Sequence, residues 1–277
     1  MGANGITPNC NGHTVRGSSP GSTGIGIKVP ADMSGVTIKN CRVIGFDNGF
    51  NIVGSNNKLQ GNLASNNELF GFATIDTNNV ELLGNVARDN GNSGFAFDDA
   101  FDDKIQGNTA THNGGAGFSI YDMSIGNNLK GNKAADNAGS GFFLSGSVNN
   151  TLRVNEAIHN GDNGFLLFDG SDKNNLQGNK AVNNGENGFF VNELSRSSKL
   201  QGNTAANNQL DGFHLSVDST NNSLAGNRAN RNLEFGYHDD SSGNTGTAGT
   251  ANLYIDNECR GNGAGGSSPT GLCKPQD

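Results

Sequence analysis

Acidic residues recur at one position of a repeating sequence, five residues after the glycine of a Gly-Phe pair. Successive repeats carry Asp76, Asp99, Asp122, Gly146, Asp169 and Glu193 at this position. Ca²⁺ takes six to eight oxygen ligands, and a bend rich in aspartate supplies them. We therefore predict Ca²⁺ as the cofactor and Asp98, Asp99, Asp122 and Asp169 as its ligands. Aspartate is also common in turns for backbone reasons, so a purely structural origin stays open.

A second group of residues is suited to binding sugars. If Phe142 and Phe189 point into a core, Phe143 and Phe190 point outward, because side chains alternate along a strand. A file of exposed aromatic residues is unusual on a monomer and offers flat faces to sugar rings. The residues that we expect to bind substrate are Tyr121, Phe143, Phe168, Phe190, Glu193 and His214. A contact between two copies of the chain explains the same strip equally well.

Two further clusters carry groups that accept protons. Lys130 and Arg153 hold equivalent positions in consecutive repeats, where other repeats have mostly neutral residues. The segment 238–240 (His-Asp-Asp) follows His214 by about one repeat. The simpler interpretations are a solvated pair of cations and a group of surface histidines.

The elements that must position these residues come from a repeat of about 23 residues. In each copy an Asn is followed by Ala, by a second Asn and then by Gly-Phe or Gly-Tyr. The copies begin at Asn62, Asn85, Asn108, Asn132, Asn155, Asn179, Asn203 and Asn227. A repeat this short cannot bury its own apolar side chains, so neighbouring copies must stack into a solenoid.

Each repeat predicts three short strands separated by Asn and Gly. The strands centre on Leu or Ile, on the Ala, and on the Phe, as at Leu129, Ala134 and Phe142. Three strands per turn predict an all-β, single-stranded parallel β-helix. We expect the Asn columns to lie at left-handed bends and to hydrogen bond from turn to turn. The stacked phenylalanines should form the core.

The period of the repeat also predicts the organisation of the chain. Residues 1–240 should form β-helix turns, with N-terminal turns over 1–55 and regular repeats over 56–240. The Gly/Ser/Thr-rich residues 241–277 break the period and should form the last turn and a C-terminal cap. No comparable cover is evident at the N-terminal end, so this open end is a second predicted site of self-association.

The turn pattern Asn-Asn-x-Leu-x-Gly-Asn-x-Ala-x-x-Asn…Gly-Phe resembles the right-handed parallel β-helix repeat family of the pectate-lyase-like superfamily. This group includes periplasmic NosD-type proteins and carbohydrate-binding or sugar-hydrolysing (CASH) domains. Residues 6–15 resemble the first turn of such domains. The resemblance covers nearly the whole chain. It implies a fold and not one reaction, because members include lyases, hydrolases, epimerases and proteins without known catalysis.

The resemblance also suggests roles for the basic pair. Polysaccharide lyases of this fold use Arg or Lys to remove the proton beside a uronate carboxylate, which a cation neutralises. Lys130 or Arg153 is thereby predicted as the catalytic base. The polygalacturonase motifs are not present as a set, and the epimerase and alginate-lyase signatures are absent. Glycoside hydrolysis and epimerisation are therefore the less favoured activities.

The four cysteines lie near the two ends of the chain. Cys10 and Cys41 are about one turn apart and predict one disulfide, and Cys259–Cys273 would close a small loop. Disulfides favour an extracellular or periplasmic protein, whereas four free thiols would indicate a cytosolic one. Neither a signal peptide nor an apolar run long enough to span a membrane is visible in this sequence.

Net charge limits the partners further. The formal net charge is −8, and no basic stripe is present, which argues against nucleic acid and against anionic membranes. Carbohydrate is the class of partner that the charge does not exclude. The sequence thus predicts an extracellular protein that interacts with polysaccharide, with lyase-like cleavage of an acidic polysaccharide as its activity. The alternative is a non-catalytic solenoid that is structural, self-assembling or a binding module.

Overall fold

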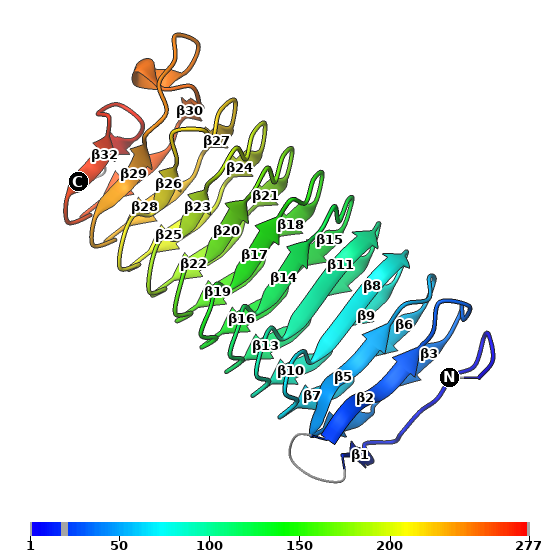
Figure 1. Cartoon of the computed structure of the whole chain (residues 1–277). Coiled ribbons are helices and arrows are strands. Elements are labelled where there is room, and N and C mark those ends of the chain that lie inside the picture. The colour runs from blue at the N-terminus through cyan, green and yellow to red at the C-terminus, as the bar shows by residue number, and fades with distance from the viewer. Residues whose placement is uncertain (1, 18–21, 276–277) are drawn as a thin grey trace.

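The chain forms an elongated solenoid in a computed structural model that describes residues 2–17 and 22–275 (Figure 1). It passes through three parallel sheets in turn, and each regular turn adds one strand to each sheet. The predicted all-β parallel β-helix, with three short strands per turn, is therefore confirmed. Among the described residues there is no helix of the length and hydropathy that a membrane crossing needs.

Sheet A has ten strands, and the central residue of each is a Leu or an Ile except in the last, which has Tyr254. The strands are β3 (Thr37–Lys39), β6 (Lys58–Gln60), β9 (Glu81–Leu83), β12 (Lys104–Gln106), β15 (Asn128–Lys130), β18 (Thr151–Arg153), β21 (Asn175–Gln177), β24 (Lys199–Gln201), β27 (Ser223–Ala225) and β30 (Leu253–Ile255). These central side chains are buried, so the flanking residues of each strand point outward.

Sheet B has twelve strands, and most of them centre on a buried alanine. The strands are β1 (Thr14–Arg16), β4 (Arg42–Ile44), β7 (Leu63–Ser65), β10 (Val86–Arg88), β13 (Thr109–Thr111), β16 (Lys133–Ala135), β19 (Glu156–Ile158), β22 (Lys180–Val182), β25 (Thr204–Ala206), β28 (Arg228–Asn230), β31 (Glu258–Arg260) and β33 (Lys274–Pro275). The small alanine leaves room inside each turn for the phenylalanine that follows it.

Sheet C has eleven strands, and most of them begin with the aromatic residue of the Gly-Phe pair or close to it. The strands are β2 (Ser22–Val29), β5 (Phe46–Ile52), β8 (Phe72–Asn78), β11 (Phe95–Phe101), β14 (Phe118–Tyr121), β17 (Phe142–Ser145), β20 (Phe165–Phe168), β23 (Phe189–Val191), β26 (Phe213–Leu215), β29 (Phe235–Asp239) and β32 (Gly265–Ser268). A short 3₁₀ segment, η1 (Thr247–Gly249), lies between β29 and β30.

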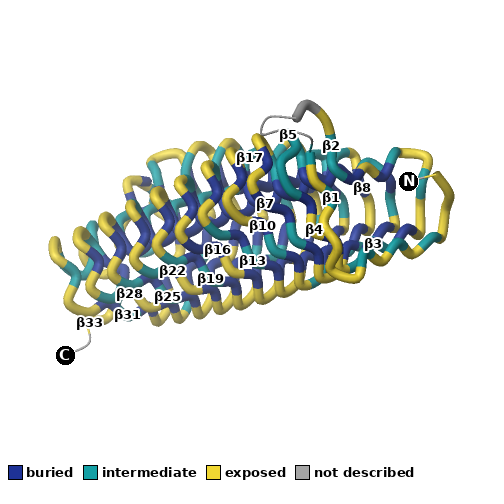
Figure 2. Tube along the Cα trace, turned by 90° about the horizontal axis from the view of Figure 1, so that it is seen from below, coloured by how far each residue is buried: buried dark blue, intermediate teal, exposed yellow. Residues whose placement is uncertain are grey.

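The core is a continuous stack of aromatic rings that runs along the solenoid axis. Rings from Phe50 to Tyr237 lie in parallel, with centroids 4.6–4.9 Å apart and interplanar angles of 3–6°. This spacing is the separation of neighbouring strands, so strand pairing itself places the rings in contact. Figure 2 shows the buried positions inside the coil and the exposed ones at its bends.

Buried asparagine side chains connect the turns at all three bends. Asn155 is typical: its Oδ1 accepts the backbone N–H of Asn132 at 2.9 Å and the side-chain N–H of Asn132 at 3.0 Å. Its own Nδ2 donates to the carbonyl oxygen of Leu129 at 3.0 Å and to Oδ1 of Asn179 at 3.1 Å. These asparagines are buried. The predicted turn-to-turn bonding of stacked asparagines is confirmed.

The left-handed residues of these bends are not the ladder asparagines, and that expectation was wrong. The residue just before the ladder asparagine is left-handed instead, as at Gly131 (φ 62°) before Asn132 and at Asp136 (φ 55°) before Asn137. The reason is that the left-handed residue turns the chain. The asparagine that follows can then point inward, where it reaches the N–H groups that the bend leaves unpaired.

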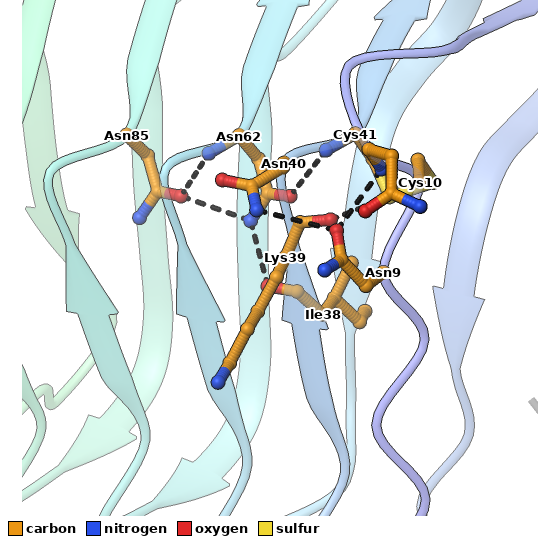
Figure 3. The surroundings of a disulfide bond; sticks show 9 residues. Asn9, Cys10, Ile38, Lys39, Asn40, Cys41, Asn62 and Asn85 are labelled. Carbon is orange, nitrogen blue, oxygen red and sulfur yellow. Dashed lines mark hydrogen bonds between the residues drawn. A yellow bond between two sulfur atoms is a disulfide. The ribbon is translucent and has the colours of Figure 1, made fainter.

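Both predicted disulfides are present. Cys10 and Cys41 have Cα atoms 4.7 Å apart, and Cys259 and Cys273 have Cα atoms 5.9 Å apart. Cys41 takes the ladder position before Asn62, because its backbone N–H donates to Oδ1 of Asn62 at 3.0 Å (Figure 3). The first disulfide therefore continues the column of turn-to-turn contacts as a covalent bond.

At the C-terminal end, a carboxylate replaces an apolar residue of the core. Asp239 is buried in register with Leu215. It accepts hydrogen bonds from Ser241, Asn252 and the hydroxyl group of Tyr254. Residues 241–252 supply part of this network, and they form the loop beside β30 that departs from the regular outline (Figure 1). Every oxygen of the buried carboxylate thus has a partner.

A second buried carboxylate interrupts the ladder between sheets C and A. Asp103 occupies a position that is Asn127 in the next turn, and its Oδ1 accepts the N–H of Val80 at 2.7 Å. Its Oδ2 accepts the hydroxyl of Thr77 at 2.9 Å. Burial, partly opposed by these two hydrogen bonds, raises the pKa of Asp103 to about 7.

We expect the substitution Asp103→Asn to stabilise the protein above about pH 7, where burying the ionised carboxylate is costly. The folded pKa lies above the unfolded value near 4, so wild-type stability is complete below about pH 4 and falls as the pH rises through 7. The gain in unfolding free energy should be about 2–4 kcal/mol at about pH 8 and near zero at about pH 4. Urea unfolding of both proteins at the two pH values measures it, with exposed Asp102→Asn as the control. An equal gain at both values would contradict the expectation.

Candidate functional site

The outward-facing positions of sheet C form one continuous surface along the solenoid. In-register residues one step after the buried aromatic column alternate to the outside. They are Ala96 and Ser119, which neighbouring residues bury, and Phe143, Leu166, Phe190, His214 and His238, which are half-buried. The column two residues further on includes Asp98, Tyr121, Ser145, Phe168 and Asp240. This surface therefore has an acidic region, an aromatic centre and a histidine-rich end.

The centre of this surface is an aromatic strip made of Phe143, Leu166, Phe168 and Phe190. All four side chains are half-buried on the outside of the coil. The rings of Phe143 and Phe168 lie 6.2 Å apart and are tilted by 43°. A shallow groove of about 300 Å³ runs beside Phe143 and Leu166 and is also lined by Ser119, Ser140 and Asp162. The strip thus combines apolar faces with neighbouring hydroxyl and carboxylate groups.

At the C-terminal end of the strip lies an Asp–His cluster, made of Asp211, His214, His238 and Asp240. Oδ2 of Asp211 is 3.0 Å from Nδ1 of His238 and 3.5 Å from Nδ1 of His214. On the opposite side of the rings, the Asp240 carboxylate is 2.9 Å from Nε2 of His214 and 3.2 Å from Nε2 of His238. Two carboxylates therefore enclose two imidazoles from both sides.

Stacking and hydrogen bonds hold this cluster in place. The rings of His214 and His238 stack with centroids 4.6 Å apart, and Phe190 stacks on the other face of His214 at 4.7 Å. Asp211 is buried, and its Oδ1 accepts the backbone N–H of Phe235 at 2.8 Å. Only Oδ2 of Asp211 is then left to face the histidines.

The acidic region lies around Tyr121, next to the other end of the strip. Burial and the charges of Asp98 and Asp122 raise the pKa of Tyr121 to about 12. Burial, followed by the charges of Asp122, Asp99 and Asp76, raises the pKa of Asp98. The charges of Asp122, Asp99 and Asp76 thus act on Asp98, and a cation beside Asp98 would relieve them.

The recurrent acidic position is also a bend position with a left-handed backbone. The residues there have φ between 41° and 59°, and they are Asp76, Asp99, Asp122, Gly146, Asp169 and Glu193. Asp and Gly tolerate this conformation, which accounts for most of the series without any ligand. Asp169 lies two turns from Asp122, about 10 Å away, and the turn between them has Gly146 at this position. Asp169 therefore lies away from the group around Tyr121.

The predicted basic pair lies on a different face. Lys130 ends β15 and Arg153 ends β18, and the two are register partners on the outside of sheet A. Both side chains are exposed. The structure brings Lys130 and Arg153 next to each other but separates them from the aromatic strip on sheet C, because a bend lies between the two sheets.

Asp211 is the residue that the sequence reasoning missed. It directly precedes a Gly-Phe pair, at a position where the preceding repeats have Asn187, Asn163 and Ser140. A carboxylate in a column of neutral polar residues was the available signal. The sequence could not show that Asp211 contacts His214 and His238. This contact arises because both histidines point outward on neighbouring strands, on the side of the coil where Asp211 lies.

The fold and this surface define a parallel β-helix protein with a polar and aromatic face on one sheet. The chain belongs to the NosD family, described as periplasmic copper-binding protein (NosD), whose model matches residues 3–163 and 126–260. Curated proteins include no matching relative.

Solved structures share the fold at low sequence identity. The A-module of the mannuronan C-5 epimerase AlgE4 from Azotobacter vinelandii superposes with a TM-score of 0.77 and 17% identity, over 99% of this chain and 82% of that one. A double mutant of the periplasmic alginate epimerase AlgG has a TM-score of 0.68 and 18% identity, over 94% and 74%. The catalytic domain of a GH87 α-1,3-glucanase gives 0.73 and 10%, over 99% and 63%. At these identities the likeness establishes the fold.

We expect Asp211→Ala to lower the free energy of unfolding by about 1–3 kcal/mol, because it leaves the N–H of Phe235 and a ring nitrogen of His238 without their buried acceptor. Urea unfolding at neutral pH measures the loss. Asp218→Ala removes an exposed carboxylate from the same region and should change stability by less than ~0.5 kcal/mol. Equal effects of the two substitutions would show that Asp211 does not organise the cluster.

Proposed function

We propose that this protein is exported and binds a linear acidic polysaccharide along the outer face of sheet C. The aromatic strip carries the proposal, since it lies on one open face between two polar regions. The negative π-faces of aromatic rings attract the positively polarised C–H groups of sugar rings. Phe143 and Phe190 lie two turns apart, about 10 Å, so a ligand that contacts both must be an oligomer.

Two observations support carbohydrate as the ligand class. The solved structures with the same fold include enzymes named for mannuronan, alginate and α-1,3-glucan. The groove beside the strip offers the exposed carboxylate of Asp162 as a hydrogen-bonding partner for sugar hydroxyl groups, and the mostly buried Ser119 and Ser140 also line it. Two disulfides and a family described as periplasmic support an extracellular or periplasmic location.

The acidic character of the ligand requires a cation. A net charge of −8 repels an anionic polymer unless a cation lies between them. We propose Ca²⁺ in this role, held by Asp98, Asp99 and Asp122, because the charges of Asp122 and Asp99 act on Asp98 and a cation would offset them. Asp169 and Glu193 lie further along the same bend and would contact the polymer or additional ions.

We further propose that the protein cleaves the bound polymer as a lyase. A lyase needs a base within hydrogen-bonding reach of the proton that it removes. Lys130 and Arg153 remain the predicted bases, and they require a polymer that continues from sheet C around the bend to sheet A. A non-catalytic structural or self-assembling solenoid is the alternative. It would use the strip or the N-terminal edge strand β2 as a contact between copies.

The description of the family as copper-binding raises the question of which residues of this chain could bind copper. Among the described residues sulfur ligands, which Cu⁺ prefers, do not gather at one place, because all four cysteines are paired in disulfides and Met33 and Met123 belong to different turns. A copper function of this chain would therefore depend on imidazole and carboxylate groups, which suit Cu²⁺.

We expect Phe143→Ala/Phe168→Ala to weaken binding of alginate, pectate or hyaluronan oligomers by about tenfold or more, because each lost aromatic contact is worth ~0.5–1.5 kcal/mol. Calorimetric titration in the presence of Ca²⁺ measures the affinity. Val217→Ala/Leu233→Ala removes two exposed apolar side chains outside the strip and should leave it unchanged. Wild-type protein that binds none of these polymers, but scatters light increasingly with concentration, would favour the self-assembly alternative.

The lyase reaction forms a C=C bond whose ultraviolet absorbance can be followed directly. We expect absorbance to rise with an acidic polysaccharide and Ca²⁺, to fall when Ca²⁺ is chelated, and to be lost in Lys130→Ala/Arg153→Ala. The matched control is Lys133→Ala/Lys180→Ala, which removes two exposed cations from sheet B. Product formation by Lys130→Ala/Arg153→Ala at the wild-type rate would exclude the predicted bases.

A further inference from the structure

We propose that Asp211, His214 and His238 form a binding site for one divalent transition-metal ion of the Cu²⁺ and Zn²⁺ class. The inference does not rest on polysaccharide binding. It rests on three potential ligands whose donor atoms all lie within 4.8 Å of one another. The ligands come from two consecutive turns, because strand pairing places His214 opposite His238.

The distances within the cluster suit a shared ion. Metal–ligand bonds of about 2.0–2.2 Å place two ligand atoms of one ion ~3–4 Å apart. Oδ2 of Asp211 lies 3.0 Å from Nδ1 of His238 and 3.5 Å from Nδ1 of His214. The rings of His214 and His238 are stacked with an interplanar angle of 14°, so they must tilt toward each other for both Nδ1 atoms to reach one ion together with Asp211.

The opposite side of the histidines has the arrangement that accompanies metal ligation. A metal-bound imidazole nearly always donates its second N–H to a carboxylate, a carbonyl or water, which fixes the tautomer. Asp240 accepts from Nε2 of His214 at 2.9 Å and lies 3.2 Å from Nε2 of His238. One carboxylate therefore orients both rings and leaves both Nδ1 atoms directed at Asp211.

The surroundings hold the ligands before any ion binds. Asp211 is buried, and its Oδ1 accepts the N–H of Phe235, so only Oδ2 faces the histidines. In the absence of an ion Oδ2 is hydrogen bonded to Nδ1 of His238 at 3.0 Å, and a bound ion would replace this contact. Phe190 stacks on His214 at 4.7 Å, and the ring of Phe235 lies 5.3 Å from that of His238. Aromatic packing on both sides restricts the imidazoles and limits water, which strengthens the attraction between the ion and Asp211.

Charge and ligand type select the class of ion. Two neutral imidazoles with the carboxylates of Asp211 and Asp240 carry a charge of −2, which one divalent cation neutralises. Imidazole nitrogen favours Cu²⁺, Zn²⁺ and Ni²⁺ over Ca²⁺ and Mg²⁺, which prefer oxygen ligands. The site is thus chemically distinct from the oxygen-only group around Tyr121.

The test uses the untagged full chain with Cu²⁺ and Zn²⁺ as probes. Calorimetric titration at neutral pH should show one ion per chain, and Cu²⁺ electron paramagnetic resonance should show coupling to nitrogen. His214→Ala/His238→Ala should lose both signals, and Asp240→Asn should weaken binding about 10- to 100-fold. Circular dichroism without metal checks that the variants fold.

A matched control exists on another face. His112→Ala/His159→Ala removes two exposed imidazoles two turns apart, with Asp136 between them, and should retain the high-affinity ion. The proposal is overturned if wild-type protein binds no ion, if His214→Ala/His238→Ala keeps it, or if the control loses it equally. Phe143→Ala/Phe168→Ala should keep the ion whether or not polysaccharide binding is found, so the two proposals fail separately.

Discussion

The structure depends on how the tight bends satisfy their buried backbone N–H groups. A solenoid turn must change direction three times within about 23 residues, and each change leaves N–H groups inside the coil that cannot reach water. In each regular turn an asparagine side chain forms the missing hydrogen bonds. The Oδ1 of Asn155, for example, accepts the backbone N–H of Asn132 in the previous turn, and its Nδ2 donates to the carbonyl oxygen of Leu129. Each asparagine accepts the N–H groups of the turn before it. A shift of the register by one residue would therefore break these hydrogen bonds along the whole ladder and leave buried N–H groups unpaired.

The fixed register determines the rest of the interior. It aligns Phe142 with Phe118 and Phe165, whose rings stack at the strand spacing. It also explains the glycine before each phenylalanine. A Cβ atom on Gly141 would lie 2.6 Å from Cβ of Ala157 and 2.7 Å from the carbonyl oxygen of Gly164, so a larger residue would push the turns apart. The aromatic core, the asparagine ladder and the glycine before each phenylalanine therefore all follow from the same register between turns.

Outward positions are free of these demands, and the chemical variety of the chain lies there. On sheet C the outer face changes from carboxylates around Tyr121, through the aromatic strip, to the Asp–His cluster. The proposed Ca²⁺, polysaccharide and transition-metal sites thus share one face while using different chemistry. Phe190 belongs to the strip and also stacks on His214, so an occupied metal site would lie directly at the end of a bound polymer.

The sequence by itself determined the period, the strands, the core columns and both disulfides, because equal residues at equal spacing must coincide once short repeats stack. It did not determine the left-handed residue of each bend, since Asn66 and Asn67 are both compatible with it and only the ladder assigns Asn67 inward. It also did not show that Asp211 and Asp240 enclose His214 and His238. Those contacts depend on side chains from two turns that face the same point. Only the tertiary structure decided this, because periodicity specifies which positions are stacked but not where their polar atoms point.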